Sequence, residues 1–206
     1  MENIGKFALK LERYRYNMIA SISWVIFGSI FATAVMTFNA LMLLGFDWYV
    51  VFTIVPAGVV SLIVFHKVRK LVCPIDSKRW KREWIFFALP FIVSYTIIPP
   101  FLSLNDLQMS TYFSTVWYPS LGVAFLLVGL FIERKDEMLV TKTMLPAGIL
   151  TLATSLPLAF LCEGVKSSYD VIAVGLIATA LMLSIYTACA LYGFFKGYKA
   201  LFTDSA

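Results

Sequence analysis

The chain has 206 residues, of which 60% are hydrophobic and 14% are charged, and its mean hydropathy is +0.83. Soluble domains carry about 25% charged and about 45–50% apolar residues, so this composition excludes an ordinary water-soluble domain. The apolar runs are continuous rather than alternating, which favours membrane-spanning helices over a β-barrel. We therefore expect an all-α, polytopic membrane protein.

The first 17 residues differ from the rest because they mix apolar and basic side chains. Ile4, Phe7, Leu11 and Tyr14 recur at helical spacing among lysines and arginines. This pattern is typical of an amphipathic helix that lies in an anionic headgroup layer. A charged helical extension of the first span would show the same pattern, so both interpretations stay open. On either interpretation, residues 1–17 and the tail 196–206 form cytoplasmic segments.

Six apolar segments predict six transmembrane helices. They cover residues 18–44, 48–65, 84–104, 112–132, 138–162 and 171–195. With the N-terminus inside, 16 of the 17 Lys and Arg residues fall on one side of the membrane, and Lys166 is the exception. Short loops rich in Lys and Arg stay in the cytoplasm. We therefore expect a cytoplasmic-membrane protein with both termini cytoplasmic.

One stretch of sequence occurs twice. Residues 53–62 return 90 positions later as residues 143–152, with five of ten positions identical, including the Thr, the Pro-Ala-Gly and the last Leu. Weaker matches pair Gly28 with Gly122 and Tyr95 with Tyr186. They predict a duplicated three-helix unit, residues 18–104 and 105–195. Because three is odd, the second unit enters from the opposite side, which gives the inverted repeat common in transporters.

The repeated Pro-Ala-Gly motif gives the candidate central site. Its two copies are Pro56, Ala57, Gly58, Pro146, Ala147 and Gly148. A proline inside a helix removes a hydrogen bond and bends the helix, and the small neighbours let another backbone approach. Such a point in each half marks a transporter site, although kinked helices that simply pack well would share it. Equivalence of the copies places the start of the fifth helix near Met138 and Lys142 inside it.

Polar residues in the apolar segments are secondary site candidates. Asn39 is the most polar group of the first span, Lys142 is the one charge expected partly in the bilayer, and Tyr95 and Tyr186 are repeat-related. Helix bridging is the alternative for Asn39, and snorkelling to the headgroups is the alternative for Lys142.

Small residues recur every four positions in three spans, and we expect these stripes to be helix–helix contacts. They consist of Ser29, Thr33 and Thr37; Ala147, Thr151, Ser155 and Ala159; and Ala180, Ser184 and Ala188.

The densest positive charge lies between the second and third spans. Because it adjoins the bilayer, its expected partner is anionic lipid rather than nucleic acid. The expected lipid contacts are Lys67, Arg69, Lys70, Lys78, Arg79, Lys81 and Arg82.

The chemistry-bearing residues match no catalytic pattern. There is no Ser-His-Asp set, no HExxH and no phosphate-binding glycine loop, and one His with three Cys makes no standard zinc set. We expect neither enzymatic activity nor a cofactor. Two functions stay open: a transporter or channel for a small neutral or weakly polar solute, or a non-catalytic subunit that packs with other membrane subunits or with further copies of itself.

Overall fold

The computed structural model of the chain describes residues 2–45, 59, 60, 63, 67, 77–137 and 139–202. Within these residues every regular element is a helix. Five helices are long and apolar enough to cross a membrane; they extend over Phe7–Leu41, Arg82–Phe101, Asp106–Lys135, Met144–Glu163 and Ser168–Ala200. The described part of the chain is thus all-helical, as the composition predicts.

The first helix is longer than any membrane requires. Helix α1 runs without a break over Glu2–Leu43, which is 42 residues. At 1.5 Å per residue it measures about 63 Å, roughly twice the thickness of a hydrocarbon core. No helix end separates the N-terminal residues from the first span. This continuity favours the charged extension over a separate helix lying in the headgroup layer.

The other helices follow the predicted spans with shifted bounds. They are α3 (Ser77–Ile92), α4 (Asp106–Thr115), α5 (Trp117–Phe131), α6 (Met144–Glu163) and α7 (Ser168–Phe202). A π-helical turn, Val93–Ile97, and a 3-10 turn, Pro99–Phe101, prolong α3. A capping box begins α4, since Asn105 Oδ1 accepts from the Gln108 backbone N–H at 2.8 Å.

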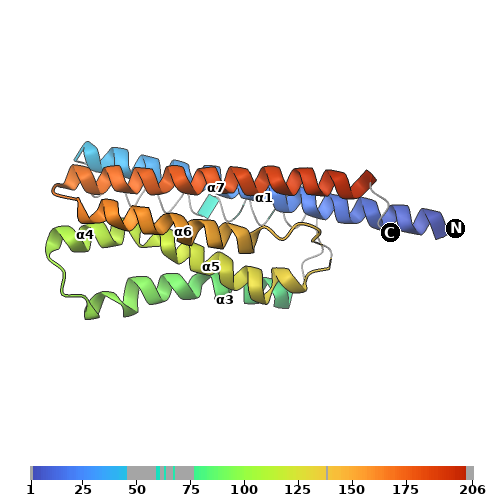
Figure 1. Cartoon of the computed structure of the whole chain (residues 1–206), viewed down its shortest axis with the longest axis horizontal. Helices are drawn as coiled ribbons and strands as arrows, with labels where there is room; N and C mark the ends of the chain where they lie inside the picture. The colour runs from blue at the N-terminus through green and yellow to red at the C-terminus, as the bar shows by residue number, and fades with distance from the viewer. Residues whose placement is uncertain are drawn as a thin grey trace.

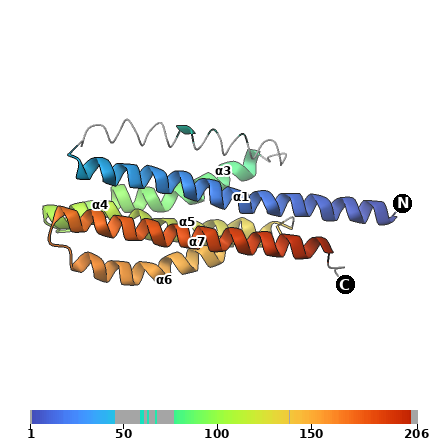
Figure 2. The ribbon, with the colours of Figure 1, turned by 90° about the horizontal axis from the view of Figure 1, so that it is seen from above.

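The helices form an elongated bundle in which both termini lie at one end (Figure 1). Helices α1 and α7 pack side by side along most of their length (Figure 2). Helix α5 lies between α3 and α6, and α6 also contacts α7. The start of α3 and the junction between α5 and α6 lie at the same end as the termini. The described Lys- and Arg-rich segments therefore share one end of the bundle.

The second predicted span and the first Pro-Ala-Gly copy lie outside the described residues. Whether the chain has six spans, and whether its halves form an inverted repeat, therefore stay predictions. The C-terminus of α1 and the N-terminus of α3 lie at opposite ends of the bundle, as a chain with six spans requires.

The predicted start of the fifth span is wrong. Helix α6 begins at Met144 rather than near Met138, and Lys142 lies in the non-helical segment before it. Pro146 is consequently the third residue of α6, where its missing N–H costs no helical hydrogen bond. It does not kink the helix interior; the proline inside α6 is Pro157.

Glycines allow the closest helix contacts. A Cβ built at Gly148 would lie 2.8 Å from the carbonyl oxygen of Gly122, so α5 and α6 pack backbone against backbone. Between α1 and α7, the side chain of Ser21 fills the space over Gly193, and that of Asn17 lies over Gly197. In lipid, such close approach contributes much of the helix association.

The predicted small-residue stripes are only partly contact faces. Ala147 and Thr151 are buried against α5, as expected. The stripes of the first and sixth spans are exposed at every position, namely Ser29, Thr33, Thr37, Ala180, Ser184 and Ala188. These two stripes are therefore not contact faces within the described chain, and a contact of either stripe with another subunit stays a prediction. The buried face of α7 carries large residues, among them Met182 and Tyr186, together with small ones, among them Ala178 and Ala190.

Candidate functional site

An aromatic cluster occupies the centre of the bundle. The rings of Trp24 in α1, Phe125 in α5 and Tyr186 in α7 meet with centroid separations of 4.9–5.7 Å. Trp24 meets both other rings edge-on, an arrangement favoured by the aromatic quadrupole. All three side chains are buried. The cluster thereby ties α1, α5 and α7 together near the middle of their apolar segments.

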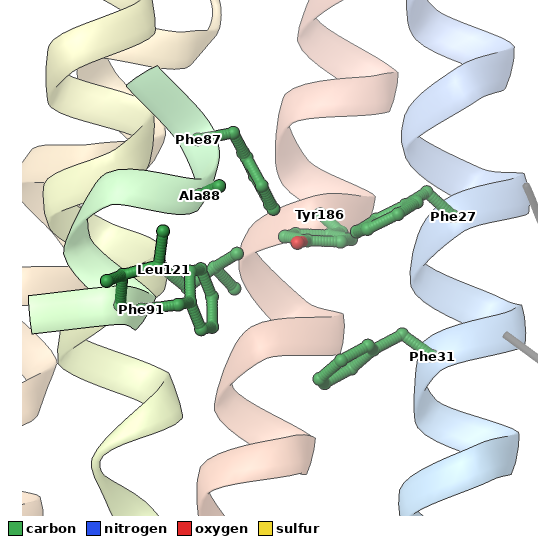
Figure 3. A pocket seen from close by; sticks show the side chains of 8 residues that line it. Phe27, Phe31, Phe87, Ala88, Phe91, Leu121 and Tyr186 are labelled. Atoms are coloured by element: carbon green, nitrogen blue, oxygen red, sulfur yellow. The ribbon is translucent and has the colours of Figure 1, made fainter. Parts of the chain in front are cut away.

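A cavity of about 310 Å³ adjoins this cluster. Figure 3 shows its walls, which come from four helices: Phe27 and Phe31 project from α1, Phe87 and Phe91 from α3, Leu121 from α5 and Tyr186 from α7. Every lining residue is uncharged. The volume lies at the lower end of the range for small-molecule sites, about 300–1,000 Å³.

The cavity has a buried floor and a more exposed rim. Leu121 and Tyr186, which form the floor, are 3% and 2% exposed. Among the lining residues of α1 and α3, Ile92 is 57% exposed and the others are half-buried. Among the described residues, the rim therefore lies between α1 and α3, within the apolar length of both helices.

The ring of Tyr186 lines the cavity, but its hydroxyl group is buried behind the cavity wall, which is apolar throughout. It is fully enclosed and has no hydrogen-bond partner among the described residues. In Figure 3 its oxygen points from α7 toward Leu121 and the Phe87 and Phe91 side chains of α3. Leaving a buried donor without a partner costs about 1–3 kcal/mol, so this hydroxyl is an unusual group at the centre of a bundle.

Gly28 sets the position of this tyrosine. A Cβ built at Gly28 would lie 2.6 Å from Tyr186 Cδ2, closer than real Cβ contacts occur. The absent side chain lets the ring lie directly on the α1 backbone. Trp24 and Phe27, on the same side of α1, contact the ring with centroid distances of 4.9 Å and 6.2 Å.

A polar cluster lies next to the aromatic one, at the N-terminus of α6. The buried carboxylate of Glu133 accepts hydrogen bonds from the backbone N–H groups of Thr143 and Met144, each at 2.8 Å, and also interacts with that of Leu145. Counted from the N-cap residue Thr143, the fourth backbone position is Pro146, which has no N–H, so the four positions at this helix end leave no donor unpaired. The carboxylate also suits the positive end of the helix dipole.

Helix α1 holds the segment before α6 in place. Asn17 Oδ1 accepts from the backbone N–H groups of Val140 at 3.0 Å and Thr141 at 3.1 Å. The hydroxyl of Tyr16 donates to Asp136 Oδ2 at 3.0 Å. About two turns further along α1, the indole N–H of Trp24 donates to Thr143 Oγ1 at 2.9 Å. Trp24 thus belongs to both clusters and connects the α6 cap to the cavity wall.

The structure places the predicted central residues away from this cavity. Ala147 and Gly148 are buried against α5, Pro146 is exposed, and none of the three lines the cavity. Pro56, Ala57 and Gly58 lie outside the described residues. The meeting of the two Pro-Ala-Gly copies is therefore untested.

The secondary candidates have different environments. Asn39 is buried, and its amide lies near Gly175 of α7 and Ser114 of α4, a helix-bridging place. Tyr95 donates to the carbonyl oxygen of Phe113 at 3.3 Å. Lys142 is exposed and donates to the carbonyl oxygen of Arg134 at 2.6 Å. Of the four, Tyr186 belongs to the cavity.

The expected lipid-contact residues are described only in part. Lys67 and Arg82 are exposed, and Lys78, Arg79 and Lys81 belong to the first turns of α3. Arg69 and Lys70 lie outside the described residues.

Sequence reasoning missed Glu133, Asn17 and the phenylalanines of the cavity. Glu133 reads as one member of a charged turn, and nothing in the sequence pairs it with residues ten positions further on. The phenylalanines carry a usable signal, because Phe27 and Phe31, and Phe87 and Phe91, are each four residues apart on one helix face. Within the described residues, no three His, Cys, Asp or Glu side chains are grouped to hold a metal ion.

Comparison of the chain with models of protein families, with curated protein sequences and with solved structures finds no match in any of the three.

Proposed function

We propose that this protein is a six-span membrane protein, with both termini cytoplasmic, that takes up a small neutral or weakly polar solute inside its helix bundle and carries it across the membrane. The observation that carries the proposal is the uncharged cavity between α1, α3, α5 and α7. A soluble ion would lose its hydration there without any charged partner, whereas a neutral solute would lose little.

In this proposal, the cavity is the solute-binding site of the transporter. A transporter must expose this place to water on one side at a time. On this proposal, the described arrangement, with its buried floor and half-buried rim, corresponds to a closed form of the transporter. An open form would separate α3 from α1.

A cysteine in the cavity rim tests this proposal. In a chain whose three cysteines are replaced by alanine, Ala88→Cys places one thiol at the cavity, and a membrane-impermeant, charged thiol reagent is added from each side of oriented vesicles. Because the reagent stays attached to the thiol, labelling accumulates with time and also detects an open form that is populated only part of the time. We expect modification from at least one side.

The matched control is Ala180→Cys, which is exposed on the outer face of α7 within its apolar segment. It should face lipid and stay unmodified by a charged reagent. If Ala88→Cys remains as unreactive as Ala180→Cys from both sides, transport through this cavity is ruled out.

One observation favours the second function, a non-catalytic membrane subunit. Ala180, Ser184 and Ala188 form a small-residue stripe on the exposed face of α7. Such a stripe suits close packing with a helix of another subunit or of a second copy. Native mass spectrometry after mild solubilisation separates the two functions: a subunit should exceed the 23.2 kDa chain mass, and Ser184→Leu should reduce the assembly to the single chain.

A further inference from the structure

We propose that the N-terminal end of helix α1 is a docking surface for an amphipathic helix of another protein, and that this partner helix carries acidic residues beside its apolar face. The surface, called here the projecting seam, consists of Phe7, Leu11, Tyr14 and Met18. It lies on the side of the membrane that the proposed topology makes cytoplasmic. The inference concerns a part of the chain away from the cavity, so it does not depend on transport.

Helices α1 and α7 run antiparallel in a constant register. Three contacts define it, namely Gly28 with Tyr186, Ser21 with Gly193 and Asn17 with Gly197. Between successive contacts both helices advance by the same number of residues in opposite directions. Continued along the pair, this register places Phe202, at the end of α7, beside Glu12. The residues of α1 before Glu12 therefore project beyond the described end of α7 (Figures 1 and 2).

This projecting end lies outside the bilayer. Helix α1 measures about 63 Å, whereas a bilayer with its headgroups is about 40–45 Å thick, so roughly 12 residues of α1 remain outside it. They are the first residues of the helix, because α1 carries no charged residue after Arg15. Phe7 lies about 16 Å along the helix from Met18, where the first span begins, and the charge of the headgroups acts over a Debye length of only about 8 Å. Lipid therefore does not cover Phe7, which is 62% exposed.

The seam residues have the spacing of a coiled-coil contact. They are separated by four, three and four residues, which is the alternation of positions a and d that places side chains on one face of a helix. Phe7, Leu11 and Met18 are exposed, and Tyr14 is half-buried. A second amphipathic helix is the kind of partner that buries such a face, by laying its own apolar residues against it.

Helix α7 adds exposed aromatic surface at the same end of the bundle. The rings of Tyr198 and Phe202 contact each other with a centroid distance of 4.8 Å, and both side chains are exposed. The register with α1 places them level with residues 16 and 12. The apolar surface outside the bilayer is therefore not confined to one helix.

The charges beside the seam define the partner. Residues 3–17 and 192–202 together hold six basic residues and one acidic residue, Glu12. Lys10 and Arg15 occupy the e and g positions that flank the seam, where charges select the partner of a coiled coil. Two copies inserted in the same direction would be parallel, and Lys10 of one copy would then lie near Arg15 of the other. The seam thus disfavours a second copy and is complementary to a helix with Glu or Asp at these positions.

Two synthetic coiled-coil peptides of three heptads each serve as probes. Both have Ile at position a and Leu at position d, and they differ at positions e and g, where the acidic probe has Glu and the basic probe has Lys. Their binding to the full-length protein in nanodiscs of zwitterionic lipid is measured by fluorescence anisotropy. We expect the acidic probe to bind at least about 10-fold more tightly than the basic probe. Added salt should reduce this difference, because the selecting charges are in contact with water.

Leu11→Ser and Leu9→Ser form a matched pair of variants. Both leucines are exposed on the projecting end, but Leu9 lies two residues from Leu11 and hence on another face of the helix. Leu11→Ser should weaken binding of the acidic probe about 10-fold, as expected for the loss of a leucine that the partner buries, whereas Leu9→Ser should leave binding unchanged. Lys10→Glu combined with Arg15→Glu should reverse the preference and favour the basic probe.

Leu11→Cys, in a chain whose three cysteines are replaced by alanine, shows whether the bilayer or a second copy covers the seam instead. We expect a water-soluble maleimide to react equally in zwitterionic and in anionic nanodiscs, and no disulfide to form between copies in proteoliposomes. Protection confined to anionic lipid would assign the seam to the bilayer surface, and a rapid disulfide between copies would assign it to a second copy. Either result overturns the inference, as do equal binding of the two probes and equal effects of the two leucine variants.

Discussion

The carboxylate of Glu133 accepts the backbone N–H of Thr143 at 2.8 Å and so begins helix α6 from the end of helix α5. Helix N-termini are normally capped by the residue just before the first turn. Here Thr143 makes no side-chain cap, and the cap comes from ten residues earlier in the chain. Helices α5 and α6 are thereby joined by one buried side chain.

Replacing this carboxylate should destabilise the protein strongly. Glu133→Gln retains one acceptor oxygen but points an amide N–H₂ group at backbone donors, and hydrogen bonds to charged groups contribute about 1.5–3 kcal/mol. We expect the free energy of unfolding, measured by titration with denaturing detergent, to fall by about 2 kcal/mol. Glu137→Gln is the control, because Glu137 is exposed, and should cost less than about 0.5 kcal/mol. Equal effects of the two substitutions would show that Glu133 does not cap α6.

Gly28 offers a test of the contact that positions Tyr186. A methyl group there would collide with Tyr186 Cδ2, so Gly28→Ala must displace the ring or separate α1 from α7. Such overpacking costs about 1–3 kcal/mol. The same substitution at Gly5 of α1 meets open space and should stabilise the helix by about 0.5–1 kcal/mol.

The two substitutions lie in one helix and add the same methyl group, but they should change the free energy of unfolding in opposite directions. Thermal unfolding in detergent, followed by tryptophan fluorescence, measures both. A stabilising Gly28→Ala would mean that α1 and α7 do not approach as closely as the structure has them.

Tyr186→Phe should stabilise the protein. Removing a buried hydroxyl that lacks a partner, while the ring stays in place, is neutral or favourable, and we expect a gain of up to about 1 kcal/mol. Tyr95→Phe should do the reverse and cost about 0.5–1.5 kcal/mol, because it breaks the bond to Phe113. A substantial loss of stability in Tyr186→Phe would indicate that the hydroxyl has a structural partner.

The sequence predicts where the helices of this protein lie along the chain better than it predicts which helix faces contact one another. Composition and continuous apolar runs are local properties, and they indicate spans that match the apolar helices Arg82–Phe101, Met144–Glu163 and Ser168–Ala200 to within about six residues at each end. The start of α6 differs because its cap, Glu133, is remote in sequence. Similarly, the exposed stripe at Ser184 and the buried face at Tyr186 belong to one helix, and only tertiary packing decides between them.

The cavity, like the helix contacts, depends on tertiary packing that the sequence does not predict. Tyr186 is a candidate from the repeat, but its unpaired hydroxyl results from the apolar residues that four helices bring around it. The Phe27–Phe31 and Phe87–Phe91 spacings indicate aromatic faces without showing that these faces meet across a cavity. The effect of Pro146 on its helix depends on where the helix begins: in the first turn, where the structure places it, the proline causes no kink.

Asn17 allows a test of the segment that precedes α6. Its side chain accepts the backbone N–H groups of Val140 and Thr141, so these two amides are protected by a residue of α1 and not by a helix. Asn17→Ala leaves both donors without this acceptor, at a cost of about 1–3 kcal/mol. Hydrogen exchange at Val140 and Thr141 should therefore accelerate about 5- to 140-fold, since each 1.4 kcal/mol corresponds to a factor of ten.

The control for this exchange measurement is Ser29→Ala, which alters an exposed position of the same helix and should leave both amides unchanged. Amides within α6, such as that of Ala147, bond to the helix's own carbonyl groups and should keep their protection in Asn17→Ala. Had α6 started near Met138, Val140 and Thr141 would belong to its first turn, and removing a side chain of α1 would not expose them selectively. Unchanged exchange at both amides in Asn17→Ala would therefore argue against the structure of this segment and for the earlier helix start.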